Sequence, residues 1–444
     1  MAKIGLISLG CPKNVVDAEE ILGEVSKAGH RIETDPEQAE VLIVNTCGFI
    51  KSAKEESIEA ILEAVRCKTE GACKSVIVTG CLSQRYGAEL AKEIPEADCF
   101  IGLGASGEIV DAIERTLSGE RSVRIAKPGD WWLEGRSRVL TTRPWTAYLR
   151  IADGCDNRCT YCAIPDIRGG FRSRSEGSIL AEAKKLAETG VKELNLVAQD
   201  VTRYGLDKEG ALALPRILDK ISEIDGIEWI RLLYCYPTRI TDDLIRVIAG
   251  NEKVCKYVDV PLQHCSDRIL SAMGRGGSKQ EYIETFDRLR EKCPDAALRT
   301  TFIVGFPGET EADVEELLEF VERVEFDRVG VFAYSPEDGT PASLLKGTVK
   351  SSTAKKRLNR VMELQQSISL GKNKGLVGKR MQILVEDADG AGSVGRSYRD
   401  APEIDGLVYL DRSVVPGRFV IAEITGARHY DLVGRIVRED CTDC

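Results

Sequence analysis

The sequence predicts an α/β protein in three parts: an N-terminal parallel α/β domain, a central open (β/α)6 barrel and a small C-terminal all-β barrel. Three observations lead to this fold class. Short apolar runs alternate with stretches of helical period over most of the chain. A stretch without a sustained period interrupts this alternation once, and the last part of the chain changes to β-rich runs with Gly-rich turns. The 444 residues also exceed what one ordinary core organises.

The first part of the chain contains three short β-branched runs, and the first two are each followed by an amphipathic stretch. Strands are predicted at 3–10, 41–47 and 75–81, and helices at 15–29 and 56–68. The order of strand, helix and strand indicates a parallel sheet. We place this domain at residues 1–118. The stretch that follows is rich in Gly, Arg, Pro and Trp and is predicted to be a linker over residues 119–140.

A second alternation begins at Ala147 and contains six strand signals. Strands are predicted at 147–151, 193–198, 229–234, 257–261, 298–305 and 329–335, and helices at 178–190, 213–224, 242–250, 279–293 and 311–324. Full closure of a parallel barrel needs about eight strands, so the barrel is expected to be open. We place this core at residues 141–371, and its last element is a basic amphipathic helix at 352–371.

The last part of the chain has the pattern of a small β-barrel. Apolar runs with Gly-rich turns lie at 379–392, 406–411 and 417–437. Such short strands with frequent turns are typical of small closed antiparallel folds. We place this domain at residues 373–440.

Composition excludes several classes of protein. The net charge of -10 gives no general attraction to phosphate backbones, and no apolar run has the length needed to cross a bilayer. The apolar run at the start is too short for a signal segment. Fifteen cysteines is a high and odd number, which argues for metal or catalytic use in a reducing compartment rather than for disulfides. We therefore expect a cytoplasmic protein without a membrane partner, and direct RNA contact is not favoured.

The stretch GCDNRCTYCAIP places three thiols at Cys155, Cys159 and Cys162, without a fourth cysteine nearby. It follows the first strand of the predicted barrel, where parallel barrels carry their chemistry. A structural zinc site needs four ligands, whereas three thiolates can hold a 4Fe-4S cluster and leave the fourth iron open to an exogenous ligand. Two other readings are a set of buried small hydrophobes and a redox pair, but the loop is polar, and a pair leaves Cys155 unexplained.

Three further cysteines end the three strands of the first domain. Cys11, Cys47 and Cys81 are separated by 36 and 34 residues, close to the length of one βα unit. Because the carboxyl ends of parallel strands meet at one edge of a sheet, these thiols can share one site. If only one of these cysteines were present, we would interpret it as a buried core residue. Three at equivalent strand ends favour a second metal site.

Other side chains follow the ends of barrel strands. Gln199 and Asp200 end one strand, and Gly305, Gly308 and Glu309 follow another. Glycines at a strand end let the backbone approach a ligand closely, so these residues are expected to line a cofactor pocket. The alternative for the glycines is a tight turn.

A basic cluster comes after the first cysteine motif. Arg168, Arg172 and Arg174 can bind a carboxylate or phosphate, and the alternative is a solvated loop. His264 ends another strand, but a lone histidine is more often structural than catalytic.

The C-x3-C-x2-C motif, with the aromatic Tyr161 before its last cysteine, resembles the signature of the radical S-adenosylmethionine enzymes. The resemblance implies that S-adenosylmethionine binds the open iron and that an electron from the cluster cleaves it to a deoxyadenosyl radical. It makes Cys155, Cys159 and Cys162 the catalytic cluster ligands. Tyr161 is then placed in the cofactor pocket with Gln199, Asp200, Gly305 and Glu309.

The order of the three parts resembles the methylthiotransferases of that superfamily over essentially the whole chain. The resemblance implies a second 4Fe-4S cluster on Cys11, Cys47 and Cys81 whose open iron holds the sulfur to be transferred, and a C-terminal TRAM domain. It also implies two molecules of S-adenosylmethionine per turnover, an electron donor such as flavodoxin and a sulfur donor.

The substrate in this family is a tRNA adenosine or a protein side chain. The stretch GCPKN and the late YDLVGR resemble the branch that modifies the β-carbon of an aspartate in protein twelve of the small ribosomal subunit; Ala18, where serine is usual, is a small departure. From residue 373 onward, 10 Lys and Arg face 12 Asp and Glu, which also favours a protein partner. Two alternatives stay open: a tRNA adenosine methylthiotransferase, and a non-catalytic RNA-binding module with structural zinc or iron at both triads.

Overall fold

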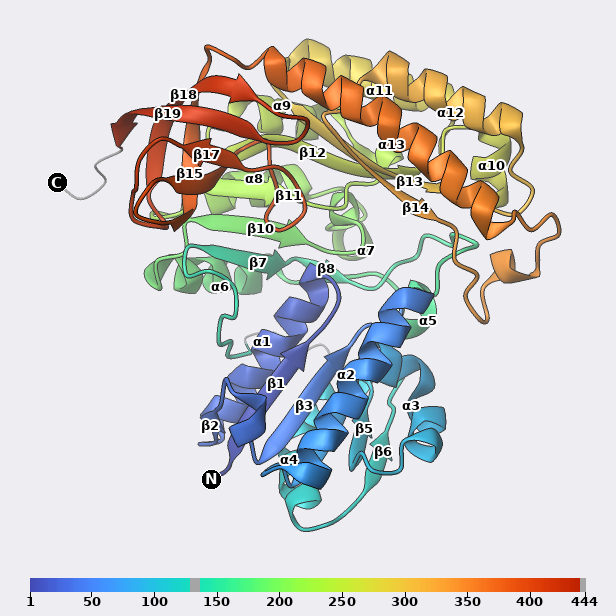
Figure 1. Cartoon of the computed structure of the whole chain (residues 1–444), viewed down its shortest axis with the longest axis vertical. Coiled ribbons are helices and arrows are strands. Elements are labelled where there is room, and N and C mark those ends of the chain that lie inside the picture. Colours follow the sequence, from blue (N-terminus) through green and yellow to red (C-terminus); the bar gives the residue numbers. More distant parts are fainter. Residues whose placement is uncertain (128–135, 440–444) are drawn as a thin grey trace.

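The computed structural model describes residues 1–127 and 136–439. Residues 128–135 of the predicted linker, and Cys441 and Cys444, lie outside the described part. Figure 1 shows the N-terminal domain below the central barrel and the C-terminal β-barrel against the opposite end of the central barrel. The predicted α/β class and its three parts are confirmed.

The N-terminal domain is a parallel sheet with helices on both faces. Its strands are β1 (Lys3–Ser8), β2 (Arg31–Ile32), β3 (Val41–Thr46), β4 (Ser75–Gly80), β5 (Cys99–Ile101) and β6 (Ser122–Arg124), in the order β2-β1-β3-β4-β5-β6. Its helices are α1 (Pro12–Lys27), α2 (Lys51–Glu70), α3 (Cys81–Glu93) and α4 (Ile109–Leu117), with short 3-10 turns at Pro36–Gln38 and Leu103–Glu108. Every residue of β3 and β4 is buried, as expected for central strands of a parallel sheet covered on both faces.

The sheet extends further than expected. Strand β6 pairs with β5 and lies inside the stretch where we predicted the linker to begin. Later in that stretch, the backbone N–H of Val139 donates to Glu19 of α1, and Arg138 pairs with Glu19 and Glu182. The connection therefore folds back on the N-terminal domain before it enters the barrel.

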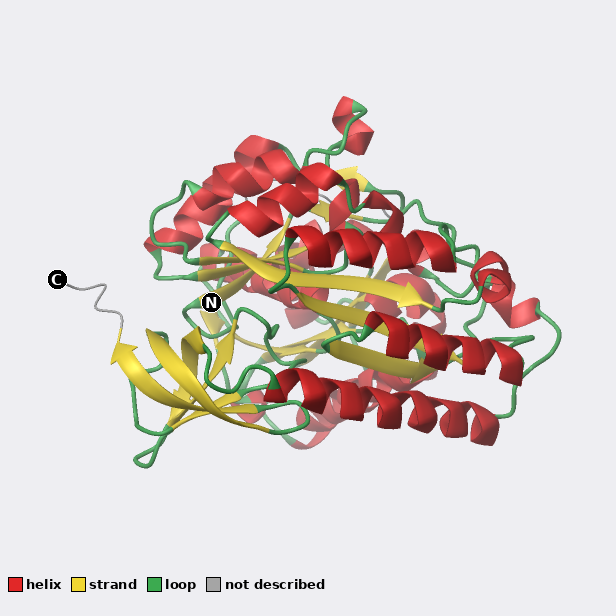
Figure 2. Cartoon of the chain, turned by 90° about the horizontal axis from the view of Figure 1, so that it is seen from above, coloured by secondary structure: helices red, strands yellow, loops and turns green. Residues whose placement is uncertain are grey.

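The central domain is an open parallel barrel of six strands. They are β7 (Thr146–Arg150), β10 (Glu193–Val197), β11 (Trp229–Leu232), β12 (Val254–Gln263), β13 (Ala297–Val304) and β14 (Arg328–Ala333), in the order β14-β13-β12-β11-β10-β7. The larger helices are α6 (Glu176–Glu188), α8 (Leu214–Ser222), α9 (Asp242–Gly250), α11 (Lys279–Lys292), α12 (Glu311–Val324) and α13 (Ser351–Lys374). Figure 2 shows these helices along the outside of the strands. Because β7 and β14 are the two edges of one sheet, the barrel is open, as predicted.

Shorter elements complete the central domain. They are the hairpin of β8 (Ala152–Asp153) and β9 (Arg172–Ser173), the helices α5 (Ile164–Arg168), α7 (Leu206–Glu209) and α10 (Asp267–Ala272), and 3-10 turns at Val201–Arg203, Pro237–Arg239 and Pro341–Leu344. The β8–β9 hairpin encloses the loop that carries the C-x3-C-x2-C motif.

The C-terminal domain is a closed five-stranded barrel. Its strands are β15 (Arg380–Ala388), β16 (Ser393–Ser397), β17 (Val408–Leu410), β18 (Phe419–Ala427) and β19 (Leu432–Glu439). Buried ion pairs attach it to the start of the central strands. Glu193 accepts hydrogen bonds from Arg231 at 3.0 Å and from Arg396 at 2.5 Å, and all three side chains are fully buried. The C-terminal domain therefore covers the end of the barrel opposite to the cysteine loop.

No helix of the described ranges has the length and apolar character needed to cross a membrane.

Candidate functional site

The loop of the first cysteine triad is held at both ends by backbone contacts. The N–H of Cys155 donates to the carbonyl of Gly169 at 3.0 Å, and the N–H of Thr160 donates to Met273 at 2.8 Å. Gly154 has φ +76°, and a Cβ there would lie 2.0 Å from the carbonyl oxygen of Gly170. Only glycine fits this position. The loop therefore presents its three thiols at the carboxyl end of β7, as predicted.

The thiols of this loop lie in a shielded environment. Burial raises the pKa of Cys155 to about 11 and that of Cys162 to about 12. Both are therefore protonated at neutral pH when they hold no metal. Metal binding must displace these protons, which makes occupancy of the site depend on pH.

The three loops of the second cysteine triad touch one another. A Cβ on Gly10 would lie 2.9 Å from Cβ of Cys47, and a Cβ on Gly48 would lie 3.0 Å from the carbonyl carbon of Cys81. Gly10 has φ +100°, so the turn before Cys11 also needs glycine. The strand ends that carry Cys11, Cys47 and Cys81 therefore lie side by side at one edge of the sheet, and a shared metal site of the three thiols stays a prediction.

Asn14 ties these loops together, a role that the sequence did not reveal. Its Nδ2 donates to the carbonyls of Leu9 at 2.9 Å and Thr46 at 3.0 Å, at the ends of β1 and β3. Its Oδ1 lies 3.6 Å from Sγ of Cys81. Only 1% of Asn14 is exposed. The sequence feature that could have predicted this role is the position of Asn14 three residues after Cys11, because a side chain in the first turn of α1 can reach the ends of both β1 and β3.

Arg168 lies between the two triads. Its Nη2 lies 2.6 Å from Asp17 and 3.6 Å from Sγ of Cys81, both in the N-terminal domain. Its Nη1 lies 3.1 Å from Asp153, which directly precedes the loop of the first triad. The guanidinium is 1% exposed and pairs with two carboxylates of the protein itself, so the alternative of a solvated loop is wrong for this residue. Arg168 connects the two triads through these buried ion pairs.

The residues at the end of β10 face the loop of the first triad. Gln199 donates from Nε2 to Asp153 at 2.8 Å, and its Oε1 is buried without a hydrogen-bond partner among the described residues. Asp200 accepts from Asn157 of the loop at 3.2 Å and pairs with Arg239 at 2.7 Å. The unpaired oxygen of Gln199 is an acceptor that a polar ligand beside the thiols can satisfy.

Two further side chains border the first triad. Arg275 stacks over the ring of Tyr236 at 4.4 Å, its Nη1 lies 3.8 Å from Sγ of Cys159, and its buried Nε has no partner in the described chain. Tyr161 packs against the apolar cluster of Ile269 and Phe306. A cation and an aromatic ring therefore lie directly beside the thiols.

The Gly305–Glu309 turn shows mainly structural contacts. Glu309 is fully buried and accepts from the N–H of Gly305 and from Arg357, each at 2.6 Å, while His264 lies 3.3 Å away. A Cβ on Gly305 would lie 2.6 Å from Cβ of Ala354 in α13. These contacts match the tight-turn alternative, and a cofactor role for Gly305 and Glu309 stays a prediction.

The thiols of each triad do not converge on one point in this structure. In residues 1–127 and 136–439, no three His, Cys, Asp or Glu side chains form a group that could hold one ion. Each thiolate of a 4Fe-4S cluster binds a different iron atom, so the three thiols need not meet at one point. Three cysteines per site, buried polar atoms without partners and glycines where backbones touch are consistent with two clusters and a polar cofactor.

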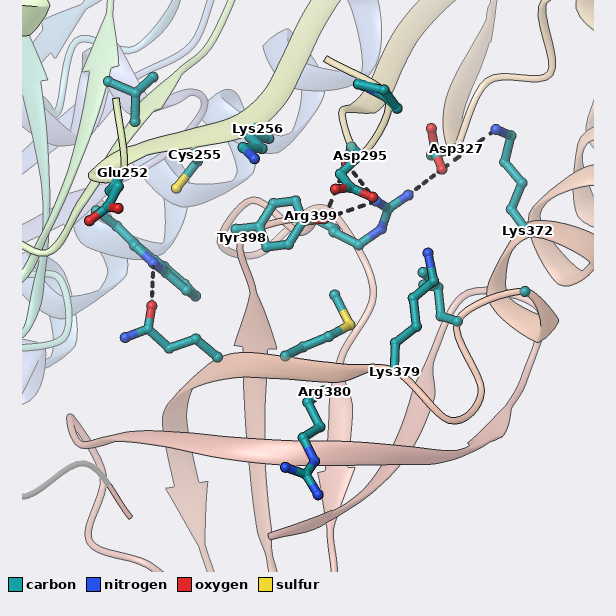
Figure 3. A pocket seen from close by; sticks show the side chains of 17 residues that line it. Glu252, Cys255, Lys256, Asp295, Asp327, Lys372, Lys379, Arg380, Tyr398 and Arg399 are labelled. Atoms are coloured by element: carbon teal, nitrogen blue, oxygen red, sulfur yellow. Dashed lines mark hydrogen bonds and ion pairs between the residues drawn. The ribbon is translucent and has the colours of Figure 1, made fainter. Parts of the chain in front are cut away.

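A cavity of about 500 Å³ lies at the other end of the barrel, between the central and C-terminal domains (Figure 3). Some of its polar groups are paired with one another: Arg399 pairs with Asp327 at 2.5 Å, and Trp229 donates to Gln382 at 3.2 Å. Lys372 also points at Asp327, at 3.9 Å. This cavity is a joint between domains and lies at the end of the strands opposite to both triads.

Comparison with sequence families gives three matches. The Radical SAM superfamily matches residues 149–321, the family described as "Uncharacterized protein family UPF0004" matches residues 3–102, and the TRAM domain matches residues 377–437. The first match contains Cys155, Cys159 and Cys162, and the second contains Cys11, Cys47 and Cys81.

Known proteins resemble the chain over nearly its full length. A protein of Pelotomaculum thermopropionicum named "Ribosomal protein uS12 methylthiotransferase RimO" is 50% identical over 98% of this chain and 99% of its own. A protein of Desulforamulus reducens with the same name is 48% identical over 99% of this chain and 100% of its own.

Among solved structures, the radical S-adenosylmethionine methyltransferase TsrM of Kitasatospora setae matches with a TM-score of 0.59. It is 13% identical, and the match covers 83% of this chain and 89% of that one, so it shows a shared fold. From the full-length relatives and the family matches, the chain belongs to the RimO family of radical S-adenosylmethionine methylthiotransferases.

Proposed function

We propose that the chain adds a methylthio group to the β-carbon of an aspartate in ribosomal protein uS12. The observation that carries this function is the pairing of two cysteine triads across one domain interface, with Arg168 in contact with both sides. A reaction that breaks a C–H bond and forms a C–S bond needs a radical source and a sulfur source next to the same carbon. The two triads supply positions for both.

The residues divide into two sets of ligands. Cys155, Cys159 and Cys162 of the C-x3-C-x2-C motif would hold one 4Fe-4S cluster with S-adenosylmethionine at its open iron. Cys11, Cys47 and Cys81 would hold the second cluster. When bound, these groups supply a radical able to break an unactivated C–H bond and the sulfur that replaces the hydrogen.

The protein's own side chains position and shield these groups. The unpaired Oε1 of Gln199 is an acceptor next to the first triad, and Arg275 places positive charge 3.8 Å from Cys159. A fixed cation beside a thiolate stabilises the negative charge of a reduced cluster without solvent reorganisation. The N-terminal domain packs through α1 against β7, which holds the two triads on one domain interface.

The charge of the chain suits a protein substrate. A net charge of -10 attracts a basic ribosomal protein, and the C-terminal domain has no excess of basic residues for RNA. A ribosomal substrate places the reaction in the cytoplasm. We further expect an electron donor such as flavodoxin and a separate sulfur donor, because reductive cleavage of S-adenosylmethionine consumes an electron and each product carries away one sulfur atom.

An anaerobic assay with two substrates tests this function. Reconstituted enzyme receives reductant, sulfide and methyl-labelled S-adenosylmethionine, with purified uS12 in one reaction and bulk tRNA in another. We expect label on one aspartate of uS12 and none in tRNA, as located by mass spectrometry. Label in tRNA and not in uS12 would instead establish an adenosine methylthiotransferase of the MiaB type.

Two cysteine variants test whether product formation depends on the first triad. Cys159→Ala removes one ligand of the first triad and is expected to abolish both cleavage of S-adenosylmethionine and product formation. Cys67→Ala is the control, because Cys67 lies near the end of α2, away from both triads. An enzyme that cleaves no S-adenosylmethionine although both triads hold iron would favour the non-catalytic alternative.

A further inference from the structure

Lys13 carries a buried charge without an acidic partner. Only 8% of the residue is exposed, yet among the described residues no carboxylate oxygen lies within 4.0 Å of its Nζ. Its contact is the ring of Tyr234, whose centroid is 3.6 Å from Nζ. Buried lysines are rare and nearly always paired, because the desolvated charge is costly. The missing anion is therefore an unexplained feature of this part of the molecule.

Lys13 lies at the interface between the second triad and the barrel. It is the second residue of α1, which begins directly after Cys11. Tyr234 follows the end of β11 in the barrel. The ammonium therefore lies where the N-terminal domain meets the carboxyl end of the barrel strands, the end that carries both triads.

The nearby carboxylates are engaged by other cations. Asp17 and Asp153 both contact Arg168, and Asp259 pairs with Arg299 at 2.8 Å. None of them lies within ion-pair distance of Lys13. An anion that binds Lys13 must therefore come from outside this set.

Tyr234 is held in a strained conformation beside Lys13. Its φ is +66°, in the left-handed region that non-glycine residues seldom adopt. Its N–H donates to Asp259 at 2.9 Å, and its carbonyl accepts from Val201 at 3.2 Å, which fixes this backbone. Strain of this kind persists where the surroundings enforce it and is common at ligand sites. The ring is thus fixed against the ammonium.

These observations, together with the proposed function on which this step rests, identify an anion that fits. We infer that Lys13 binds the side-chain carboxylate of the substrate aspartate, and that the Tyr234 ring forms the other side of this binding site. The carboxylate is bonded directly to the β-carbon that reacts. A charge-assisted hydrogen bond from Nζ therefore fixes that carbon next to the second triad, and it rejects uncharged side chains.

The test is a cycle of two enzymes and two substrates. The enzymes are reconstituted wild type and Lys13→Met, and the substrates are uS12 and uS12 with its target aspartate replaced by asparagine. Binding is measured without reductant, and methylthio formation with reductant gives kcat/KM for the aspartate substrate. Wild type is expected to bind the aspartate form on the order of tenfold to a hundredfold more tightly than the asparagine form. Lys13→Met is expected to bind both forms equally weakly.

Controls separate substrate binding from folding and from cluster effects. Lys27→Met makes the same change at the exposed end of the same helix and should keep the wild-type preference. Iron content and the electron paramagnetic resonance spectrum should be unchanged in Lys13→Met. If that variant loses iron, Lys13→Gln, which keeps a polar group but no charge, takes its place and should likewise lose the preference.

Each other result overturns the inference. If Lys13→Met keeps the wild-type preference for aspartate, Lys13 does not bind the carboxylate. If the preference stays while the spectrum of the second cluster shifts, the ammonium acts on the cluster instead. If wild type neither binds nor modifies uS12, the proposed function itself fails, which the wild-type reactions show independently of any variant.

Discussion

Replacing Arg168 by methionine removes the guanidinium that joins the N-terminal domain to the cysteine loop. Asp17 keeps its ion pair with Arg150. Asp153 keeps hydrogen bonds from Gln199 and Gly154, and its remaining cation among the described residues is Arg150 at 3.7 Å. Removing one partner of a buried ion pair costs about 3–5 kcal/mol, and the lower end applies because Arg150 remains. A loss of about 3 kcal/mol raises the equilibrium constant for opening of this interface on the order of a hundredfold.

Hydrogen exchange of the amides of α1 measures this opening directly. We expect their protection in Arg168→Met to fall on the order of a hundredfold, whereas Arg216→Met, at an exposed ion pair, changes it little. Adding Asp17→Asn to Arg168→Met should recover part of the loss, because it removes a buried charge that has lost a partner. Unchanged protection of α1 in Arg168→Met, or an equal loss in Arg216→Met, would refute the reasoning.

Three further changes follow from the contacts described above. Gly80→Ala places a Cβ 2.4 Å from a carbonyl oxygen at a φ of +95°, so we expect it to lower the iron content of the second triad. Gly29→Ala, with φ +83° and open space around the Cβ, should leave the iron content unchanged, and a measurement of iron per chain in the two variants tests this difference. Burial raises the pKa of Glu193, but Arg396 and Arg231 lower it to about 2, below its ordinary 4.5. Its stabilising effect is therefore present above about pH 4.5 and lost as the pH falls toward about 2, so proteolysis of the C-terminal domain should increase over that range. Burial raises the pKa of Cys81 to about 12, so the thiol must release a proton when it binds iron. The iron bound per chain after reconstitution should therefore rise with pH between about 7 and 9, and an amount of iron that does not change with pH would argue against proton release.

Periodicity was enough to predict the six barrel strands and three of the strands of the N-terminal sheet, but it missed β2, β5, α3 and α4. The predicted strands at 41–47 and 75–81 end within one residue of β3 and β4, because each apolar run stops at a cysteine. Strand β6 was missed because three residues with alternating burial carry too little signal. The return of the linker onto α1 depends on Arg138 and Glu19, and a single ion pair leaves no period in a sequence.

The cysteine positions could be predicted for a different reason than the residues around them. Strand ends of a parallel sheet must meet, so Cys11, Cys47 and Cys81 follow from topology. Asn14 and Arg168 act through contacts between segments 154 residues apart, and no local pattern marks such a pair. The cofactor role of Glu309 stays a prediction, and its strand-end position did not reveal the buried ion pair with Arg357.

The central claim is that the two triads have separate roles in one reaction, and removing one triad tests it most directly. The variant with Cys11, Cys47 and Cys81 replaced by alanine is compared with the intact enzyme, in the presence of uS12, S-adenosylmethionine and reductant. We expect the variant to release deoxyadenosine and methionine but to form no methylthio-aspartate. Methylthio-aspartate formed by the variant, or cleavage of S-adenosylmethionine lost with the N-terminal triad although the other triad keeps its iron, would contradict the account.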